Sequence, residues 1–239
     1  MTGSAVRPPL VLLPGMNCSD DLWAEVDVPG SIRWPLAERS VARQVTELLD
    51  GLPERFVIAG LSLGGVIAME TALAAPDRVA GLCVMSVNGR APTAAQRQGW
   101  RAWRERLATG ETPAGLQREI LPSLLQAPVR RRRPDLTDRV LGMGAQTTAD
   151  ELDAQLAQQL SRRPLLDRLA ALDLPTLVVS GAADPICPRA FHDEITAAVR
   201  GARLVSVDAG HLPPLERPDA VRAVLDTWLA EVAGGPRQR

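Results

Sequence analysis

The sequence predicts an α/β protein with a mostly parallel sheet of about six strands and an all-helical insertion. Five apolar runs with helix-like segments between them are strand candidates: 10–13, 56–61, 79–87, 176–181 and 203–208. A weaker run at 31–34 is a sixth candidate. Continuous runs rich in Val and Leu are typical of parallel strands that are buried on both faces. Helical patterns between such strands predict crossover connections.

The helical patterns follow the strands in order. Residues 37–49 carry one apolar stripe, which Gly51 ends, and residues 63–75 are small and apolar nearly all round. A further helix is predicted to begin at Pro218, because proline is favoured in the first turn of a helix.

The alternation of strands and helices breaks in the middle of the chain. Residues 88–171 contain several helical patches and no clear strand, so we expect an α/β core from residues 1–87 and 172–233 with a helical insertion between them. An insertion at this place would lie over the carboxyl ends of the strands, where open α/β sheets bind ligands. It is therefore interpreted as a cap, the alternative being a helical extension that merely covers the sheet. Residues 234–239 are predicted to be a disordered tail.

Composition and charge exclude several classes of function. The net charge of -1 gives no electrostatic reason to expect a nucleic-acid or membrane partner, and all 27 basic residues are arginine, which excludes Schiff-base chemistry on lysine. The three cysteines fit no metal motif, so we expect no metal and no cofactor, and a reducing cytoplasmic setting. The oligomeric state is left open.

The stretch Gly60-Leu61-Ser62-Leu63-Gly64 has the pattern G-x-S-x-G between a predicted strand and a predicted helix. A serine nucleophile on such a sharp turn needs small neighbours, and the following helix supplies free amides for a developing negative charge. A tight turn without chemistry is the alternative. The context favours Ser62 as a nucleophile.

A serine nucleophile needs a base, and the chain has two histidines. His211 follows the last predicted strand, whereas His192 lies in a helical pattern among charged neighbours and is predicted to be a surface residue. An acid must orient the base, and Asp184 follows the strand 176–181. Ser62, Asp184 and His211 are therefore the predicted catalytic residues.

These three segments together resemble the α/β-hydrolase superfamily. The nucleophile elbow is "GLSLGG", the acid loop "SGAADPICP" and the histidine loop "GHLPPLERPDAV", in the order Ser, Asp, His. In some members the acid follows an earlier strand, but Asn88 holds that place here. The resemblance covers nearly the whole chain apart from the helical segment, and it implies the α/β-hydrolase fold.

The resemblance also implies an oxyanion hole. The segment "LLPGMNCSDDLW" after the first strand corresponds to the one that usually begins with His-Gly, and Pro14 stands here in place of the histidine. Because the donors are backbone N–H groups, the expected pair is Met16 and Leu63.

Within the superfamily, the residues favour acyl transfer to water. A serine nucleophile argues against dehalogenases and epoxide hydrolases, which use aspartate, and Leu212 stands where hydroxynitrile lyases have lysine. The expected substrate is a small, partly apolar carboxylic ester, thioester or lactone. A carbon-carbon bond hydrolase, a perhydrolase and a non-catalytic ligand-binding protein of the same fold are the alternatives.

Two features of the insertion bear on partners. Trp100 and Trp103 lie on one helical face and are candidates for substrate contact, although packing of the insertion on the core is the commoner role of buried tryptophan. The arginine run 130–133 could attract an acyl carrier protein, but such runs are more often solvated surface.

Overall fold

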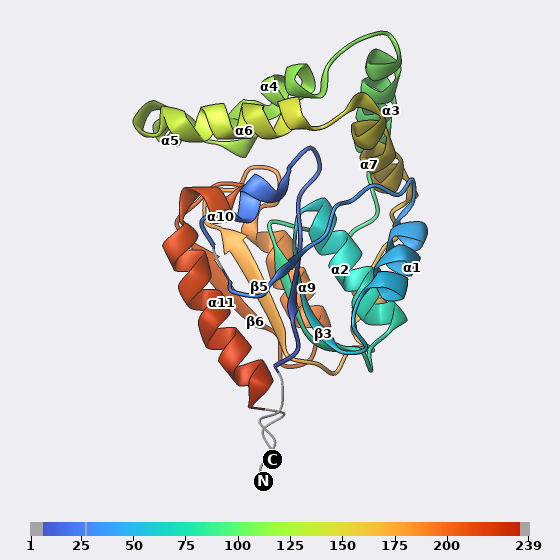
Figure 1. The fold of residues 1–239 in the computed structure, drawn as a ribbon, viewed down its shortest axis with the longest axis vertical. Coiled ribbons are helices and arrows are strands. Elements are labelled where there is room, and N and C mark those ends of the chain that lie inside the picture. The colour runs from blue at the N-terminus through green and yellow to red at the C-terminus, as the bar shows by residue number, and fades with distance from the viewer. Residues whose placement is uncertain (1–6, 27, 235–239) are drawn as a thin grey trace.

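A parallel sheet of six strands forms the centre of the computed structural model, which describes residues 7–26 and 28–234 (Figure 1). The strand order is β2-β1-β3-β4-β5-β6, and every neighbouring pair is parallel. The strands are β1 (Leu10–Leu13), β2 (Ile32–Arg33), β3 (Phe56–Leu61), β4 (Val79–Met85), β5 (Thr176–Gly181) and β6 (Arg203–Val207). The predicted fold class is confirmed, including the weak strand candidate at 31–34.

The register of the sheet brings the ends of β3 to β6 to one edge. Leu61 pairs with Met85, and Gly181 pairs with Val207, so β3 ends beside β4 and β5 ends beside β6. Met85 also pairs with Val179 of β5. The loops that carry Ser62, Asp184 and His211 therefore all begin at the carboxyl edge of the sheet.

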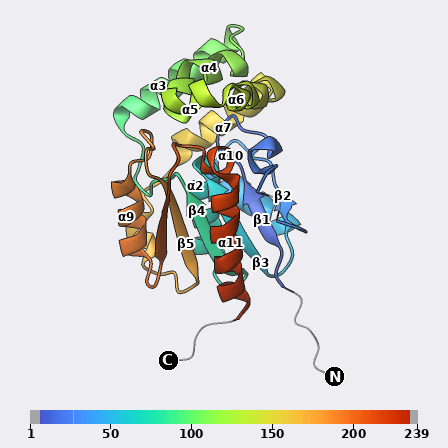
Figure 2. The same cartoon turned by 90° about the vertical axis from the view of Figure 1, so that its left-hand side faces the viewer.

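Helices cover both faces of the sheet (Figures 1 and 2). One layer contains α1 (Val41–Gly51), α2 (Leu63–Ala74), α8 (Leu166–Leu169) and α9 (Arg189–Ala198). The opposite layer contains the 3-10 helix η1 (Asp20–Trp23), α10 (Pro213–Glu216) and α11 (Pro218–Ala233). Because strand side chains alternate, Ile58 packs toward the first layer and Val57 toward the second.

The helical insertion lies over the carboxyl edge of the sheet (Figures 1 and 2). It comprises α3 (Ala94–Ala108), α4 (Pro113–Leu124), α5 (Ala127–Arg132), α6 (Pro134–Gln146) and α7 (Ala149–Ser161). Helix α3 packs on α7, and α4 packs on α6. Thr93 and Thr148 begin α3 and α7 with capping boxes, in which the threonine hydroxyl accepts the N3 amide and the N3 side chain accepts the threonine amide.

Some predicted boundaries are wrong by a few residues, for local reasons. The helix expected from residue 37 begins at Val41, because the Ser40 side chain accepts a hydrogen bond from the amide of Arg43 and so caps it. The strand expected to reach residue 87 ends at Met85, since Ser86 has a φ of 47°. Helix α11 ends at Ala233 with Gly234 as its C-cap, and the rest of the predicted tail, 235–239, lies outside the described residues.

Among the described residues, no helix combines the length and apolar character that crossing a bilayer requires.

The prediction that His192 lies on the surface is wrong. Its side chain on α9 is fully buried. The amide of Val87 donates to His192 Nε2 at 3.2 Å, and Nδ1 lies 3.4 Å from the carbonyl oxygen of Pro188, which fits a neutral ring with its proton on Nδ1. Burial lowers the pKa of His192 and favours this neutral form. The charged neighbours in sequence suggested exposure, whereas the ring itself faces the core.

We expect His192 to make the fold sensitive to mild acid. Because its folded-state pKa lies below the ordinary value of 6.5, the unfolded chain binds the proton first as the pH falls. The neutral, buried His192 therefore makes its full contribution to the free energy of unfolding above about pH 6.5. Below that pH the contribution is lost, and the free energy of unfolding falls by at most about 1.4 kcal/mol per pH unit from this cause. In urea unfolding between pH 7 and pH 5, the free energy of unfolding should fall less steeply with pH in His192→Gln than in the wild type. Identical slopes would contradict this role.

Candidate active site

Ser62 occupies a strained turn between β3 and α2. Its φ of 54° and ψ of -112° lie in a region that L-residues rarely adopt, and its amide donates to the carbonyl of Met85 at 2.9 Å. The turn needs glycine on both sides. A Cβ on Gly60 would lie 2.2 Å from the carbonyl oxygen of Gly64, and a Cβ on Gly64 would lie 2.5 Å from that of Pro14. The two glycines thus allow the tight approach of α2 to β1 and β3.

His211 and Asp184 form a buried pair. His211 Nδ1 and Asp184 Oδ2 are 2.8 Å apart, and the other carboxylate oxygen accepts the amides of Ile186 at 2.8 Å and Cys187 at 3.0 Å. Burial alone would raise the pKa of Asp184, but the bond to His211 and the two amides hold it below its usual value. The carboxylate is therefore ionised at neutral pH. Since His211 uses Nδ1 for this bond, its Nε2 remains available.

Glu216 holds the loop that carries His211. Its Oε1 accepts the amide of Gly210 at 2.9 Å and that of Leu212 at 3.4 Å, so one carboxylate oxygen binds the backbone on both sides of the histidine. Burial raises the pKa of Glu216, although the two amides oppose this effect. The contact fixes the backbone from which the His211 side chain projects.

Ser62 and His211 line one cavity of about 360 Å³ beneath the helical insertion. Met16, Trp100 and Trp103 line it as well. Most of its remaining surface is apolar and comes from both the insertion and the core, including Ile120, Leu124, Ile186 and Leu212. The two tryptophans also pack against the leucine cluster of the insertion, so they contact both the cavity and the helices around it. The cavity thus brings the predicted nucleophile, base and aromatic residues together.

The amides predicted to bind an oxyanion are free. The N–H groups of Met16 and Leu63 donate no hydrogen bond to any other described residue. Leu63 is the first residue of α2, where the helix dipole and unbonded amides favour negative charge.

Asn17, next to Met16, fastens this loop to the insertion. It is buried with a φ of 58°, and its amide donates to Gln155 Oε1 of α7 at 2.7 Å. Its side-chain Nδ2 donates to Gln117 Oε1 of α4 at 3.0 Å and to the carbonyl of Pro113 at 2.9 Å. Sequence reasoning missed these residues, because partners about a hundred positions apart leave no local pattern.

One group of side chains at the site has metal-ligand character. Asp184, Cys187 and His211 each offer a ligand atom, and these atoms all lie within 4.8 Å of one another. A metal here would compete for the His211 nitrogen that binds Asp184. It would also need a thiolate, whereas burial raises the pKa of Cys187 to about 12. The donor set fits a hydrogen-bonded pair better than a metal centre.

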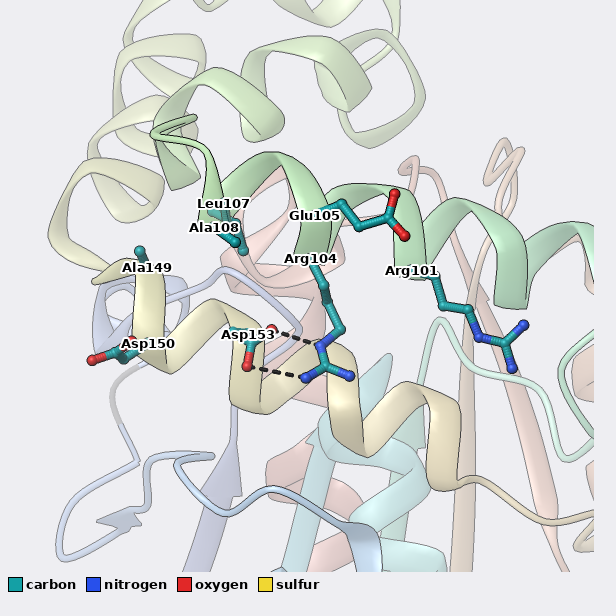
Figure 3. A pocket seen from close by; sticks show the side chains of 8 residues that line it. All are labelled: Arg101, Arg104, Glu105, Leu107, Ala108, Ala149, Asp150 and Asp153. Carbon is teal, nitrogen blue, oxygen red and sulfur yellow. Dashed lines mark hydrogen bonds and ion pairs between the residues drawn. The ribbon is translucent and has the colours of Figure 1, made fainter.

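A second hollow lies on the insertion between α3 and α7 (Figure 3). It has a volume of about 520 Å³, and Arg104 and Asp153 form an ion pair in it. Asp153 also pairs with Arg39 from the core. None of Ser62, Asp184 and His211 lines this hollow. The cavity that contains Ser62 is therefore the candidate active site.

The chain belongs to the alpha/beta hydrolase family, whose model matches residues 10–224. A pimeloyl-acyl-carrier-protein methyl ester esterase of Aromatoleum aromaticum is 26% identical over 253 residues, which span 92% of this chain and 97% of that protein. A candidate non-heme bromoperoxidase of Mycobacterium tuberculosis is 30% identical over 201 residues, or 78% of this chain and 71% of that protein.

Solved structures agree with this assignment. A thermophilic esterase from Thermogutta terrifontis superimposes with a TM-score of 0.82 at 25% identity, covering 95% of this chain and 90% of that chain. Esterases are thus among the relatives in both sequence and structure.

We expect Gly64→Ala to destabilise the protein by about 1–3 kcal/mol, because the added Cβ would meet backbone atoms that cannot move independently. Gly142→Ala in α6 is the matched control. A Cβ there has no atom within 4 Å, so helix propensity should stabilise the protein by up to about 1 kcal/mol. Denaturant unfolding of both variants measures the difference. Equal stabilities would show that the turn at Ser62 is looser than described.

Proposed function

We propose that the protein is a serine hydrolase that cleaves a small, partly apolar carboxylic ester through Ser62, His211 and Asp184. The observation that carries this proposal is the buried His211–Asp184 pair, whose histidine lines the same cavity as a serine on a strained strand-to-helix turn. A histidine whose Nδ1 is held by an ionised carboxylate is suited to accept a proton at Nε2.

The chemistry follows the usual course of acyl transfer. His211 Nε2 takes the proton of Ser62 as the serine oxygen attacks the ester carbonyl, and the amides of Met16 and Leu63 bind the resulting oxyanion. The protonated histidine then donates to the leaving alcohol, and Ser62 retains the acyl group. His211 next deprotonates a water molecule that attacks this acyl-enzyme, which releases the acid and returns the proton to Ser62.

The cavity and the relatives support an ester of modest size. A volume of about 360 Å³ with mostly apolar walls suits a short acyl chain better than a polymer. Thioesters and lactones present the same carbonyl chemistry. Because relatives are named for an ester on an acyl carrier protein, such a carrier is a candidate partner that would present the substrate. The exposed Arg131 and Arg132 of α5 are the side chains that would contact this acidic protein.

Perhydrolysis is a second candidate activity. The similarity to a candidate non-heme bromoperoxidase favours it. Hydrogen peroxide would replace water in the attack on the acyl-enzyme, and the product would be a peracid. The same residues would serve both reactions.

The wild type should release nitrophenolate from para-nitrophenyl esters of short acids. Ser62→Ala should fall to the background rate, and Asp184→Asn should lower kcat by roughly 10³- to 10⁴-fold, since the histidine loses its orienting carboxylate. Ser206→Ala, which removes an exposed serine from β6, is the control and should keep the wild-type rate. Steady-state kinetics measure all four proteins. Tight binding of a ligand without turnover by folded wild type would favour the non-catalytic alternative.

A further inference from the structure

The cavity that contains Ser62 also contains a buried arginine. Arg162 directly follows α7, its residue is 9% exposed, and it lines the cavity together with Ser62 and His211. Nothing in the local sequence distinguishes it from the neighbouring Arg163, which is exposed. Its position therefore emerges only from the fold.

Every oxygen that Arg162 binds is neutral. Nη1 donates to Gln159 Oε1 at 3.0 Å, and Nη2 donates to the backbone oxygen and side-chain Oδ1 of Asn88 at 3.1 and 3.3 Å and to the carbonyl of Arg90 at 3.4 Å. No carboxylate of the described residues forms an ion pair with it. Arg168, six positions further along, instead pairs with the buried Glu70.

A buried charge without a counter-charge destabilises the protein. Removing a guanidinium from water is unfavourable unless opposite charge or full hydrogen bonding compensates. Burial lowers the pKa of Arg162 to about 10, which still leaves the group protonated at neutral pH. The cavity therefore holds a permanent positive charge beside the serine and histidine.

The guanidinium also has an unused donor. Its Nε is buried and has no hydrogen-bond partner among the described residues, whereas Nη2 binds carbonyls of the loop after β4. Because Arg162 lines the cavity, its positive charge without a counter-charge is suited to attract an anion there.

We propose that Arg162 binds a carboxylate of the substrate, so that the preferred ester carries a second, ionised carboxyl group, as a half-ester of a dicarboxylic acid does. This inference rests on the proposed ester hydrolysis. One guanidinium matches the single charge of a carboxylate, and the apolar walls at Trp100 and Ile120 suit the chain between the two carbonyl groups. Arg162 would then determine specificity, while Ser62 and His211 perform the reaction.

Arg162 also tethers the insertion to the loop after β4, so its substitution affects structure as well. The test must therefore compare two substrates that differ only in charge. Mono-para-nitrophenyl adipate and the para-nitrophenyl ester of adipamic acid have the same chain, but the first ends in a carboxylate and the second in an amide.

The wild type should prefer the charged ester, and Arg162→Gln should lower the ratio of kcat/KM for the charged over the neutral ester by roughly 10- to 100-fold, mainly through KM. Arg162→Lys, which keeps the charge, should retain part of the preference, and Arg163→Gln should keep all of it. A purely structural role would lower both rates together and leave the ratio unchanged, which would overturn the proposal.

Binding tests the arginine independently of turnover. In titration calorimetry, the Ser62→Ala variant should bind adipate and should not bind adipamide. Adding Arg162→Gln to this variant should raise the Kd for adipate by roughly 10- to 100-fold. Adipate binding that depends on Arg162, with no cleavage of either ester by wild type, would overturn the hydrolase proposal and support the anion site. Equal cleavage of both esters without adipate binding would overturn the anion site alone.

Discussion

The positive φ of Ser62 is the constraint on which the rest of the site depends. A serine held in this conformation projects from the end of β3 into the cavity only if α2 begins at once and lies close to β1 and β3. That closeness requires glycine at positions 60 and 64, where a Cβ would meet backbone oxygen. With this geometry the Leu63 amide at the start of α2 has no hydrogen-bond partner among the described residues. One strained turn therefore positions both the Ser62 hydroxyl and the amide predicted to bind an oxyanion.

The helical insertion completes the site through buried polar contacts. Gln155 and Gln117 hold Asn17, and with it the loop that carries the Met16 amide. Arg162, at the end of α7, holds the loop after β4 and places a positive charge in the cavity. The candidate catalytic residues thus lie on loops of the sheet, whereas the insertion contributes to the shape and charge of the cavity.

Local sequence patterns are enough to predict the fold and the candidate triad, but they do not predict the long-range contacts. Apolar runs predict the six strands, and Ser62, Asp184 and His211 each lie just after a strand, so the edge of a parallel sheet gathers them. The buried states of His192 and Arg162 were not predictable, since both stand among charged residues in the sequence. Their burial results from packing between elements about seventy or more positions apart.

The central claim is that Ser62 is an activated nucleophile, and covalent labelling tests it most directly. A fluorophosphonate probe followed by intact-mass measurement should add one adduct to the wild type and none to Ser62→Ala or His211→Ala, because the probe reacts with a serine whose proton a base can take. No adduct on folded wild type, or an adduct that persists in Ser62→Ala, would contradict the account.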